Sequence, residues 1–158
     1  MDPSAKTVFT DPAHLFAFGF GSGLAPFAPG TFGTAAAIPF YLLMQSLSLP
    51  LYLGLVLIAF IFGVWVCGKA GAALGEHDHG GIVWDEFVGF WVTMVAAPSG
   101  WQWIVAGFLL FRLFDIWKPW PINWADQQLS GGLGVMLDDL IAGLYALILL
   151  QGMARLVG

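Results

Sequence analysis

Charge is scarce in this chain. Only 9% of its 158 residues are Asp, Glu, Lys or Arg, whereas an ordinary soluble domain carries about 25%. Hydrophobic residues make up 59% of the sequence, so water is not its main solvent and a membrane protein is indicated. Five Lys and Arg residues are too few for the basic footprint that nucleic acid requires. We therefore expect no nucleic-acid partner.

Cysteine is almost absent as well. Cys67 is the single cysteine and lies inside the apolar run VWVCGKAG, which excludes an intrachain disulfide and a thiolate metal cluster. We expect a buried, small hydrophobic side chain there. The first residues, MDPSAKTVFTDPAH, lack the basic start, apolar core and cleavage site of a secretory signal peptide. The polar N-terminus is therefore expected to remain in the mature protein.

Long apolar runs dominate the rest of the chain, and no polar linker or low-complexity stretch divides them. We expect one membrane-embedded domain over residues 1–158, with residues 1–13 as a polar N-terminal segment. A helix needs about 20 residues to cross the hydrocarbon core. The predicted fold is all-α, a polytopic helical membrane protein with about four to five membrane-embedded helices and a polar pocket at the cytoplasmic interface. The apolar runs cover residues 32–49, 51–68, 82–97, 101–117 and 135–153.

The segments that flank these runs alternate in polarity. SLSLP and APSG are short and uncharged, which favours tight helical hairpins. GFGSGLAPFAPGTFGT, KAGAALGEHDHGG and KPWPINWADQQLSGGLG fall on one side together with Lys6, Lys69 and Lys118, so the positive-inside rule makes that side cytoplasmic. Five spans put the C-terminus outside, which Arg155 opposes. Four spans, with the short third run re-entrant, bring Arg155 back inside.

The net charge of −5 is concentrated in one part of the chain. Between residues 69 and 139, eight acids stand against three bases, whereas the charges outside this window cancel. Unpaired charge near hydrocarbon is costly, so this excess calls for a cation. The acids are Glu76, Asp78, Asp85, Glu86, Asp115, Asp126, Asp138 and Asp139, and the bases are Lys69, Arg112 and Lys118.

Two adjacent acidic pairs are expected to open helices, Asp85 with Glu86 in GGIVWDEFVGF and Asp138 with Asp139 in GGLGVMLDDLIAG. Small residues follow about one turn later, which lets two helix backbones approach closely. One acid per helix would satisfy the helix dipole, whose effect is about 0.3 to 1 kcal/mol. The second acid points about 100° away. We therefore favour metal ligation by these carboxylates over helix capping.

The ligand types select the predicted metal. A carboxylate site without thiolates suits a hard cation, and magnesium is typically held by a few carboxylates, waters and substrate phosphate. Mg²⁺ is therefore the predicted cofactor. His77 and His79 in EHDHGG would suit zinc or manganese, but an isolated HxH pattern has little specificity. Each histidine fits a substrate or proton-transfer role as well as it fits a structural hydrogen bond.

Basic residues near the end of the fourth run could bind an anion. Arg112, Asp115 and Lys118 in FRLFDIWKPWPI are spaced by three residues and share one helix face. The alternative is an intrahelical salt-bridge ladder beside interfacial tryptophans. The two interpretations are compatible.

A glycine-rich segment offers a second anion site. In GSGLAPFAPGTFGT, glycines such as Gly30 free backbone N–H groups to form a concave anion site. Thr31 and Thr34 stand where the first helix is expected to begin, and helix starts favour phosphate. A re-entrant turn packed with glycine is the alternative for this segment.

Several phosphatase signatures are missing. Cys67 lacks a Cys-x5-Arg loop, Asp-x-Asp-x-Thr is absent, and no Ser-Arg is followed by a distal His. These absences argue against cysteine phosphatases, enzymes that form an aspartyl-phosphate and lipid phosphatases with a histidine nucleophile. Metal-assisted hydrolysis remains, in which a divalent cation activates water and neutralises charge on the phosphoryl oxygens.

Four motifs together resemble the phosphatidylglycerophosphatase A family. They are GFGSGLAPFAPGTFGT, HDHGGIVWDEFVG, FRLFDIWKPWPI and GGLGVMLDDLIAG, in the family's order over about residues 14–144. The resemblance implies a magnesium-dependent hydrolase of phospholipid biosynthesis that converts phosphatidylglycerophosphate to phosphatidylglycerol and phosphate. It also implies a multi-pass protein of the bacterial inner membrane whose active site faces the cytoplasm.

Roles of individual residues within that site are our inference. Water attack and an Asp nucleophile both remain open as the first chemical step. The predicted metal ligands or their supports are Asp85, Glu86, Asp138 and Asp139; the predicted phosphate contacts are Lys69, Arg112, Lys118, Gly30, Thr31 and Thr34; the predicted general base is Asp78 or Asp115; and the predicted proton donor is water, His77 or His79.

Two other classes of function compete with the phosphatase. An ion transporter would use carboxylates near membrane depth as its pathway, but these acids stand at helix ends beside basic residues. A non-catalytic lipid-binding or assembly protein would account for the abundant tryptophan and glycine. The phosphatase is the interpretation that also uses the acidic pairs and the basic face.

Overall fold

The computed structural model describes residues 2–158, and every regular element in that range is helical. The all-α fold class predicted from the apolar runs is confirmed. The helices are α1 (Ala5–Thr10), α2 (Pro12–Ala17), the 3-10 helix η1 (Gly19–Leu24), α3 (Pro29–Met44), α4 (Leu49–Leu74), α5 (Trp84–Thr93), α6 (Trp101–Trp117), α7 (Ile122–Gln128) and α8 (Gly131–Val157).

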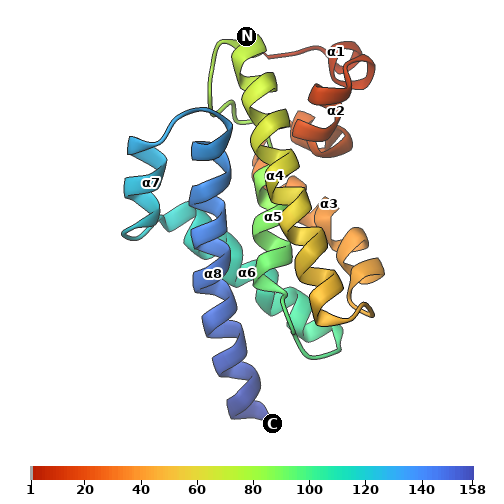
Figure 1. Cartoon of the computed structure of the whole chain (residues 1–158), viewed down its shortest axis with the longest axis vertical. Helices are drawn as coiled ribbons and strands as arrows, with labels where there is room; N and C mark the ends of the chain where they lie inside the picture. The colour runs from red at the N-terminus through yellow and green to blue at the C-terminus, as the bar shows by residue number, and fades with distance from the viewer. Residues whose placement is uncertain (1) are drawn as a thin grey trace.

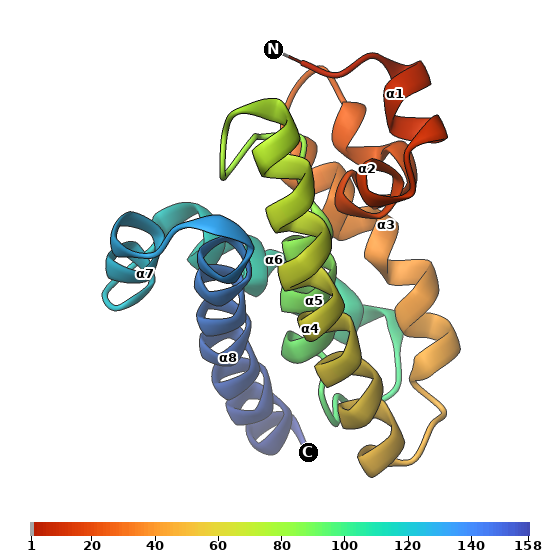
Figure 2. The ribbon, with the colours of Figure 1, turned by 45° about the horizontal axis from the view of Figure 1, so that its top comes forward.

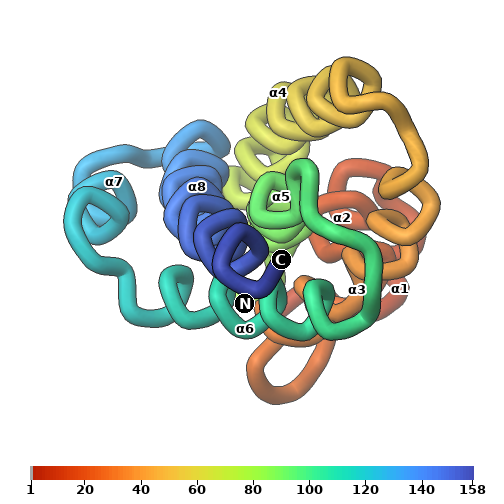
Figure 3. Tube along the Cα trace, turned by 90° about the horizontal axis from the view of Figure 1, so that it is seen from below, coloured from red at the N-terminus to blue at the C-terminus, as the bar shows by residue number. Residues whose placement is uncertain are grey.

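Helix α5 occupies the centre of the bundle. Every one of its residues is buried, because α3, α4, α6 and α8 pack around it (Figure 3). Its 10 residues extend only about 15 Å, which is half of the hydrocarbon thickness. The third apolar run therefore forms an enclosed helix that is too short to span a bilayer.

Two helices are long and apolar enough to cross a membrane. Helix α4 has 26 residues and a most apolar window with a mean hydropathy of 2.4, and α8 has 27 residues with a value of 2.0. They pack against one another (Figure 1). Helices α3 and α6 are shorter, and α6 runs obliquely across the bundle (Figures 1 and 3). The number of helices that cross the bilayer therefore stays a prediction.

The polar segments lie toward one end of the molecule. Helices α1 and α2, the α4–α5 connection and α7 are found at that end, whereas the α3–α4 and α5–α6 connections lie toward the other (Figures 1 and 2). This separation follows the alternation of polar and uncharged connections in the sequence. The last turn of α8, which carries Arg155, lies at the end opposite to the polar segments (Figure 1).

Helix α8 begins earlier than the sequence predicts. The apolar run starts at residue 135, but the helix starts at Gly131 because its glycine-rich first turn packs against α4. A Cβ atom on Gly132 would lie only 1.8 Å from the carbonyl oxygen of Val64. Asp138 and Asp139 consequently lie about two turns inside α8, and the prediction that they open a helix is wrong. Because the helix dipole acts within the first turn, capping does not explain this pair.

Two glycines allow α5 and α8 to cross in close contact. A Cβ atom on Gly143 would lie 2.6 Å from the carbonyl oxygen of Gly89. A Cβ atom on Gly89 would lie 3.0 Å from the carbonyl oxygen of Asp139. This is the close approach that small residues after the acidic pairs predicted. The crossing sets the separation between Asp139 and the first turn of α5.

Replacing Gly143 by alanine is expected to destabilise the fold by about 1–3 kcal/mol, because the added methyl group overpacks a backbone contact. The measurement is the free energy of unfolding in detergent. Gly54→Ala on α4 is the matched control, since a Cβ atom there meets no atom within 4 Å; it should stabilise the helix by about 0.5–1 kcal/mol. Equal effects of the two substitutions would contradict a tight crossing.

Candidate active site

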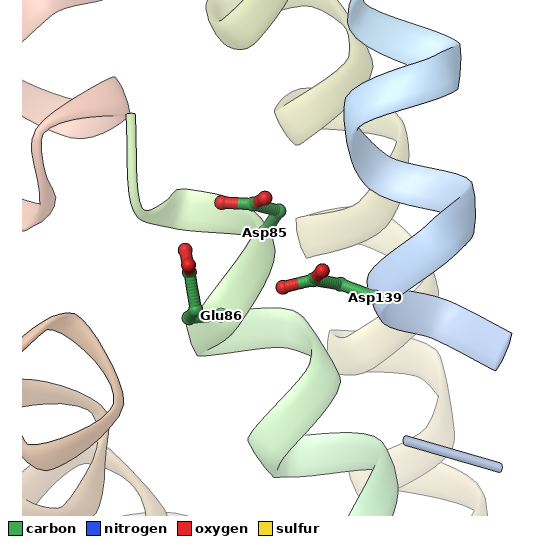
Figure 4. Close-up of side chains that lie close together, drawn as sticks. All are labelled: Asp85, Glu86 and Asp139. Carbon is green, nitrogen blue, oxygen red and sulfur yellow. The ribbon is translucent and has the colours of Figure 1, made fainter. Parts of the chain in front are cut away.

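Three carboxylates from two helices that are distant in sequence converge beside the crossing (Figure 4). Asp85 and Glu86 come from the first turn of α5, and Asp139 comes from α8. One oxygen atom of each lies within 4.8 Å of the other two, so a single ion could contact all three. We call this set the carboxylate triad. It brings together three of the four residues predicted as metal ligands.

The carboxylate triad is buried and lacks hydrogen-bond donors. Asp85, Glu86 and Asp139 are 6%, 9% and 2% exposed. Within residues 2–158, no partner donates to Asp85 Oδ1, Glu86 Oε2 or Asp139 Oδ2. Neighbouring buried carboxylates without donors are unfavourable unless a cation neutralises them. Because hard divalent cations prefer oxygen ligands, these residues fit the predicted magnesium ion.

Arg112 brings positive charge to the edge of the carboxylate triad. From α6, its Nη1 atom donates a hydrogen bond to Asp115 and lies 3.8 Å from Glu86 Oε1. Its Nε atom has no hydrogen-bond partner in the described part of the chain. The guanidinium therefore keeps a buried donor for an anion, and Arg side chains are well suited to phosphate.

Gly30, at the start of α3, completes this edge of the site. A Cβ atom on Gly30 would lie 2.6 Å from Glu86 Oε1 and 3.0 Å from Arg112 Nη1. A larger residue would therefore displace the ends of both side chains from their positions against the helix start. The start of α3 therefore meets the ion pair through its backbone, as a phosphate-binding helix start requires.

Lys118 is the centre of a second charged group. It follows the last residue of α6 with a left-handed backbone, φ 51°, and its Nζ atom donates to Asp138 Oδ2 at 2.7 Å. Asp126 Oδ1 and Asp115 Oδ1 lie 3.5 and 3.8 Å from Nζ. Burial lowers the pKa of Lys118, but attraction to the carboxylates, above all Asp138, outweighs burial and raises the pKa. Lys118 therefore stays protonated at neutral pH.

The two adjacent acids of α8 serve different partners. Asp138 pairs with Lys118, whereas Asp139 joins the carboxylate triad. Successive residues of a helix point about 100° apart, which explains the separation. Asp138 Oδ1 is buried and has no hydrogen-bond partner among residues 2–158. Its role as a ligand, or as support for one, stays a prediction.

The two predicted histidines lie in different surroundings. His79 is buried, its Nε2 atom lies 3.0 Å from Asp2 Oδ1, and its Nδ1 atom accepts a hydrogen bond from the N–H of Gly81 at 3.0 Å. These contacts fit the structural alternative, in which His79 ties the N-terminal segment to the α4–α5 connection. His77 and Asp78 are exposed in that connection, so both remain accessible for proton transfer.

The other predicted phosphate contacts have local partners. Lys69 Nζ lies 5.4 Å from the ring centre of Trp65, a cation–π arrangement on α4. Thr34 is buried, and its Oγ1 atom donates to the carbonyl oxygen of Gly30 within α3. Thr31 lies in the first turn of the same helix. Cys67 is buried, as expected.

Sequence reasoning missed two acidic partners of predicted residues. Asp126 on α7 faces Lys118, and Asp2 faces His79. Both contacts depend on how short terminal or connecting segments fold back onto the bundle, which spacing along one helix does not encode. For Asp126, the only available signal was an acid in the same polar segment as Lys118.

The arrangement combines a cation-binding and an anion-binding element. The carboxylate triad would hold a divalent cation, and Arg112 with the start of α3 offers donors directly beside it. Such a pair of elements suits a phosphate monoester, whose oxygens can contact a metal ion and an arginine at once. The charged group around Lys118 adds a second cation nearby.

Known proteins resemble this chain along nearly its whole length. A sequence model described as phosphatidylglycerophosphatase A matches residues 15–154. The chain is 50% identical to phosphatidylglycerophosphatase A of Escherichia coli (strain K12) over 143 residues, which is 90% of this chain and 83% of the relative. It is 47% identical to phosphatidylglycerophosphatase A of Haemophilus influenzae over 149 residues, which is 93% of this chain and 91% of the relative.

A third relative carries a different name. A protein of Bacteroides thetaiotaomicron named "Putative phosphatidylinositol-3-phosphatase" is 39% identical over 152 residues, which is 91% of this chain and 94% of the relative. No solved structure matches the chain. Both names are those of phosphatases that act on lipids.

Proposed function

The chain belongs to the phosphatidylglycerophosphatase A family, and from this premise we propose that it hydrolyses phosphatidylglycerophosphate to phosphatidylglycerol and phosphate with Mg²⁺ as cofactor. The reaction is a step of phospholipid biosynthesis. We place the protein in the bacterial inner membrane as a multi-pass protein, with its site toward the cytoplasm. The lysine-bearing polar segments support this orientation through the positive-inside rule.

The observation that carries the proposal is the carboxylate triad beside Arg112. Three buried carboxylates with free oxygens would hold the cation. When bound, Mg²⁺ lowers the pKa of water and neutralises charge on phosphoryl oxygens. Of the four carboxylates expected to ligate, Asp85, Glu86 and Asp139 are the ones whose geometry supports this role.

Binding of the terminal phosphate falls to Arg112 and the start of α3. Arg112 offers Nε, which has no partner in residues 2–158, while Asp115 accepts from its Nη1 atom and fixes the guanidinium plane. The backbone of Gly30 lies against the same guanidinium. A phosphoryl group held there lies beside Glu86 of the carboxylate triad. Lys118, which stays protonated, adds favourable potential nearby.

Proton transfer must accompany hydrolysis. A water oxygen bonds to phosphorus, the bond from phosphorus to the glycerol oxygen breaks, and that oxygen gains a proton. Because Asp115 contacts both Arg112 and Lys118, it orients the cations, which leaves Asp78 as the favoured general base. His77 is the favoured proton donor. If label from solvent water entered an enzyme carboxylate during one turnover, an Asp nucleophile would replace direct water attack.

The substrate assignment is tested by comparing lipid phosphomonoesters. Purified protein in mixed micelles is supplied with phosphatidylglycerophosphate, phosphatidylinositol-3-phosphate or phosphatidic acid, and phosphate release is measured. We expect kcat/KM for phosphatidylglycerophosphate to exceed the others by at least about tenfold, because a site built for a polar headgroup rejects lipids that leave its donors unpaired. Preference for the phosphoinositide would overturn the substrate while keeping the phosphatase class.

A further inference from the structure

The carboxylate triad is buried, so a lipid must approach it from the surface of the helix bundle. Glu86 faces the start of α3 and α6, where Gly30 and Arg112 meet it. We call the line along which Gly30 approaches Arg112 the α3–α6 seam. The seam leads to an outer face of the bundle, since α6 lies along its periphery (Figure 3).

The outward face of α6 beside the seam is apolar. Leu109, Leu113 and Ile116 are 61%, 51% and 69% exposed, and they occupy one side of the helix because they recur at spacings of three and four. Asp115 is buried on the inner side. Arg112 is half-buried at the border of the two faces. An apolar stripe thus runs along the bundle surface directly up to a buried guanidinium.

Aromatic side chains lie on the outer face at the start of α3. Phe27 and Phe32 are exposed, and their rings meet edge to face with centroids 5.5 Å apart. Phe32 follows Gly30 by two residues, so its side chain points about 200° away from the Gly30 face that meets Arg112. The two phenylalanines therefore lie outside the seam, where they are suited to contact acyl chains of the surrounding bilayer.

We propose that the lipid substrate reaches the carboxylate triad sideways from the bilayer through the α3–α6 seam. Its acylglycerol part lies on Leu109, Leu113 and Ile116, and its terminal phosphate lies between Arg112 and Gly30. This inference rests on the proposed function and adds to it the entry face and the contribution of the acyl chains to substrate binding. At the inner end of the seam, the positive charge of Arg112 complements a phosphate. At the outer end, the apolar face of α6 is continuous with the bilayer. Both features suit a phospholipid.

A competing apolar groove lies on the opposite side of α5. This cavity of about 340 Å³ is lined by apolar side chains of α2, α3, α4 and α5, including Trp84 and Trp91. Trp84 precedes Glu86 by two residues, so their side chains point about 200° apart around the helix. A lipid in the groove would be separated from Glu86 by the body of α5. The seam is therefore the route that connects hydrocarbon with the phosphate donors.

The test uses paired variants and paired substrates. Leu113→Ser with Ile116→Ser makes the seam polar, and Ile58→Ser with Ile61→Ser is the matched control on the exposed face of α4. The substrates are diacyl phosphatidylglycerophosphate in vesicles and its water-soluble deacylated headgroup. We expect the seam variant to lose about tenfold in kcat/KM on the diacyl lipid, with unchanged hydrolysis of the headgroup and an unchanged control variant.

Each other outcome has a defined meaning. Equal loss in the seam and control variants, or equal loss on both substrates, would overturn the seam as the lipid route. If the unaltered protein hydrolyses neither substrate, the proposed function is refuted instead. The two failures are therefore distinguishable in one experiment.

A binding readout independent of turnover completes the test. Phosphatidylglycerophosphate with a photoreactive group in one acyl chain is bound to the protein, crosslinked and mapped by peptide mass spectrometry. We expect label within residues 109–116, on the apolar face of α6. Label confined to residues 55–62 and to Trp91 would place the chain in the opposite groove and overturn the proposal.

Discussion

Replacing Asp139 by asparagine is expected to lower kcat/KM for phosphate release by at least about 10³-fold, which corresponds to several kcal/mol of lost charge stabilisation. Asparagine keeps the shape of the side chain but removes one charge from the carboxylate triad. Asp139 is the only contribution of α8 to this group, so its loss leaves Asp85 and Glu86 as two neighbouring acids of one helix. Steady-state phosphate release from phosphatidylglycerophosphate at saturating Mg²⁺ measures the effect.

A control separates this effect from misfolding. In the presence of chelator, Asp139→Asn should keep or raise the free energy of unfolding, because one of three neighbouring buried like charges is gone. Glu76→Gln removes an exposed acid outside the triad and should leave activity unchanged. Retention of about a tenth of the activity or more by folded Asp139→Asn, a loss of about 1.4 kcal/mol or less, would exclude the triad as the reaction centre.

Removal of divalent cations is expected to have an effect of similar size. Chelator-treated protein should release phosphate at less than about 1% of the original rate, because the cation stabilises developing charge by several kcal/mol. Added Mg²⁺ should restore the rate. Binding should also stabilise the fold, by about 2.7 kcal/mol at a cation concentration 100 times Kd. Activity is measured as phosphate release, and binding as the shift in melting temperature.

The melting shift connects the cation to its ligands. Asp139→Asn should lose most of the Mg²⁺-dependent rise in melting temperature, whereas Glu76→Gln should keep it. Activity that is indifferent to chelator would remove the metal from the mechanism. Restoration by zinc but not by magnesium would show that the hard-cation assignment is wrong and would bring His77 back as a candidate ligand.

The sequence predicted the parts of this site that local patterns encode. Apolar runs predicted the all-α fold, and the small residues after the acidic pairs predicted the close contact between Gly89 and Gly143. Adjacent acids in two separate runs suggested one shared centre, and the structure brings Asp85, Glu86 and Asp139 together. Each of these features depends on periodicity or residue size, which a single sequence displays.

Other parts depended on tertiary packing. The apolar pattern missed the first turn of α8, because this turn is rich in glycine and packs against α4 through Gly132. Spacing placed Asp138 and Asp139 in one set, but of these two acids only Asp138 forms a salt bridge with Lys118, at the end of α6. The contact from Lys118 to Asp126 requires α7 to fold back onto α8. No property of the segments taken singly indicates these encounters.

The enclosed position of α5 has a consequence for biogenesis. A helix of 10 residues with two acids in its first turn cannot enter the bilayer by itself, because it neither spans the hydrocarbon nor satisfies its charges there. It depends on partner helices, and α8, which supplies Asp139 and covers one side of α5, is synthesised after it. A nascent chain is therefore expected to be chemically inert until α8 has left the ribosome and been inserted.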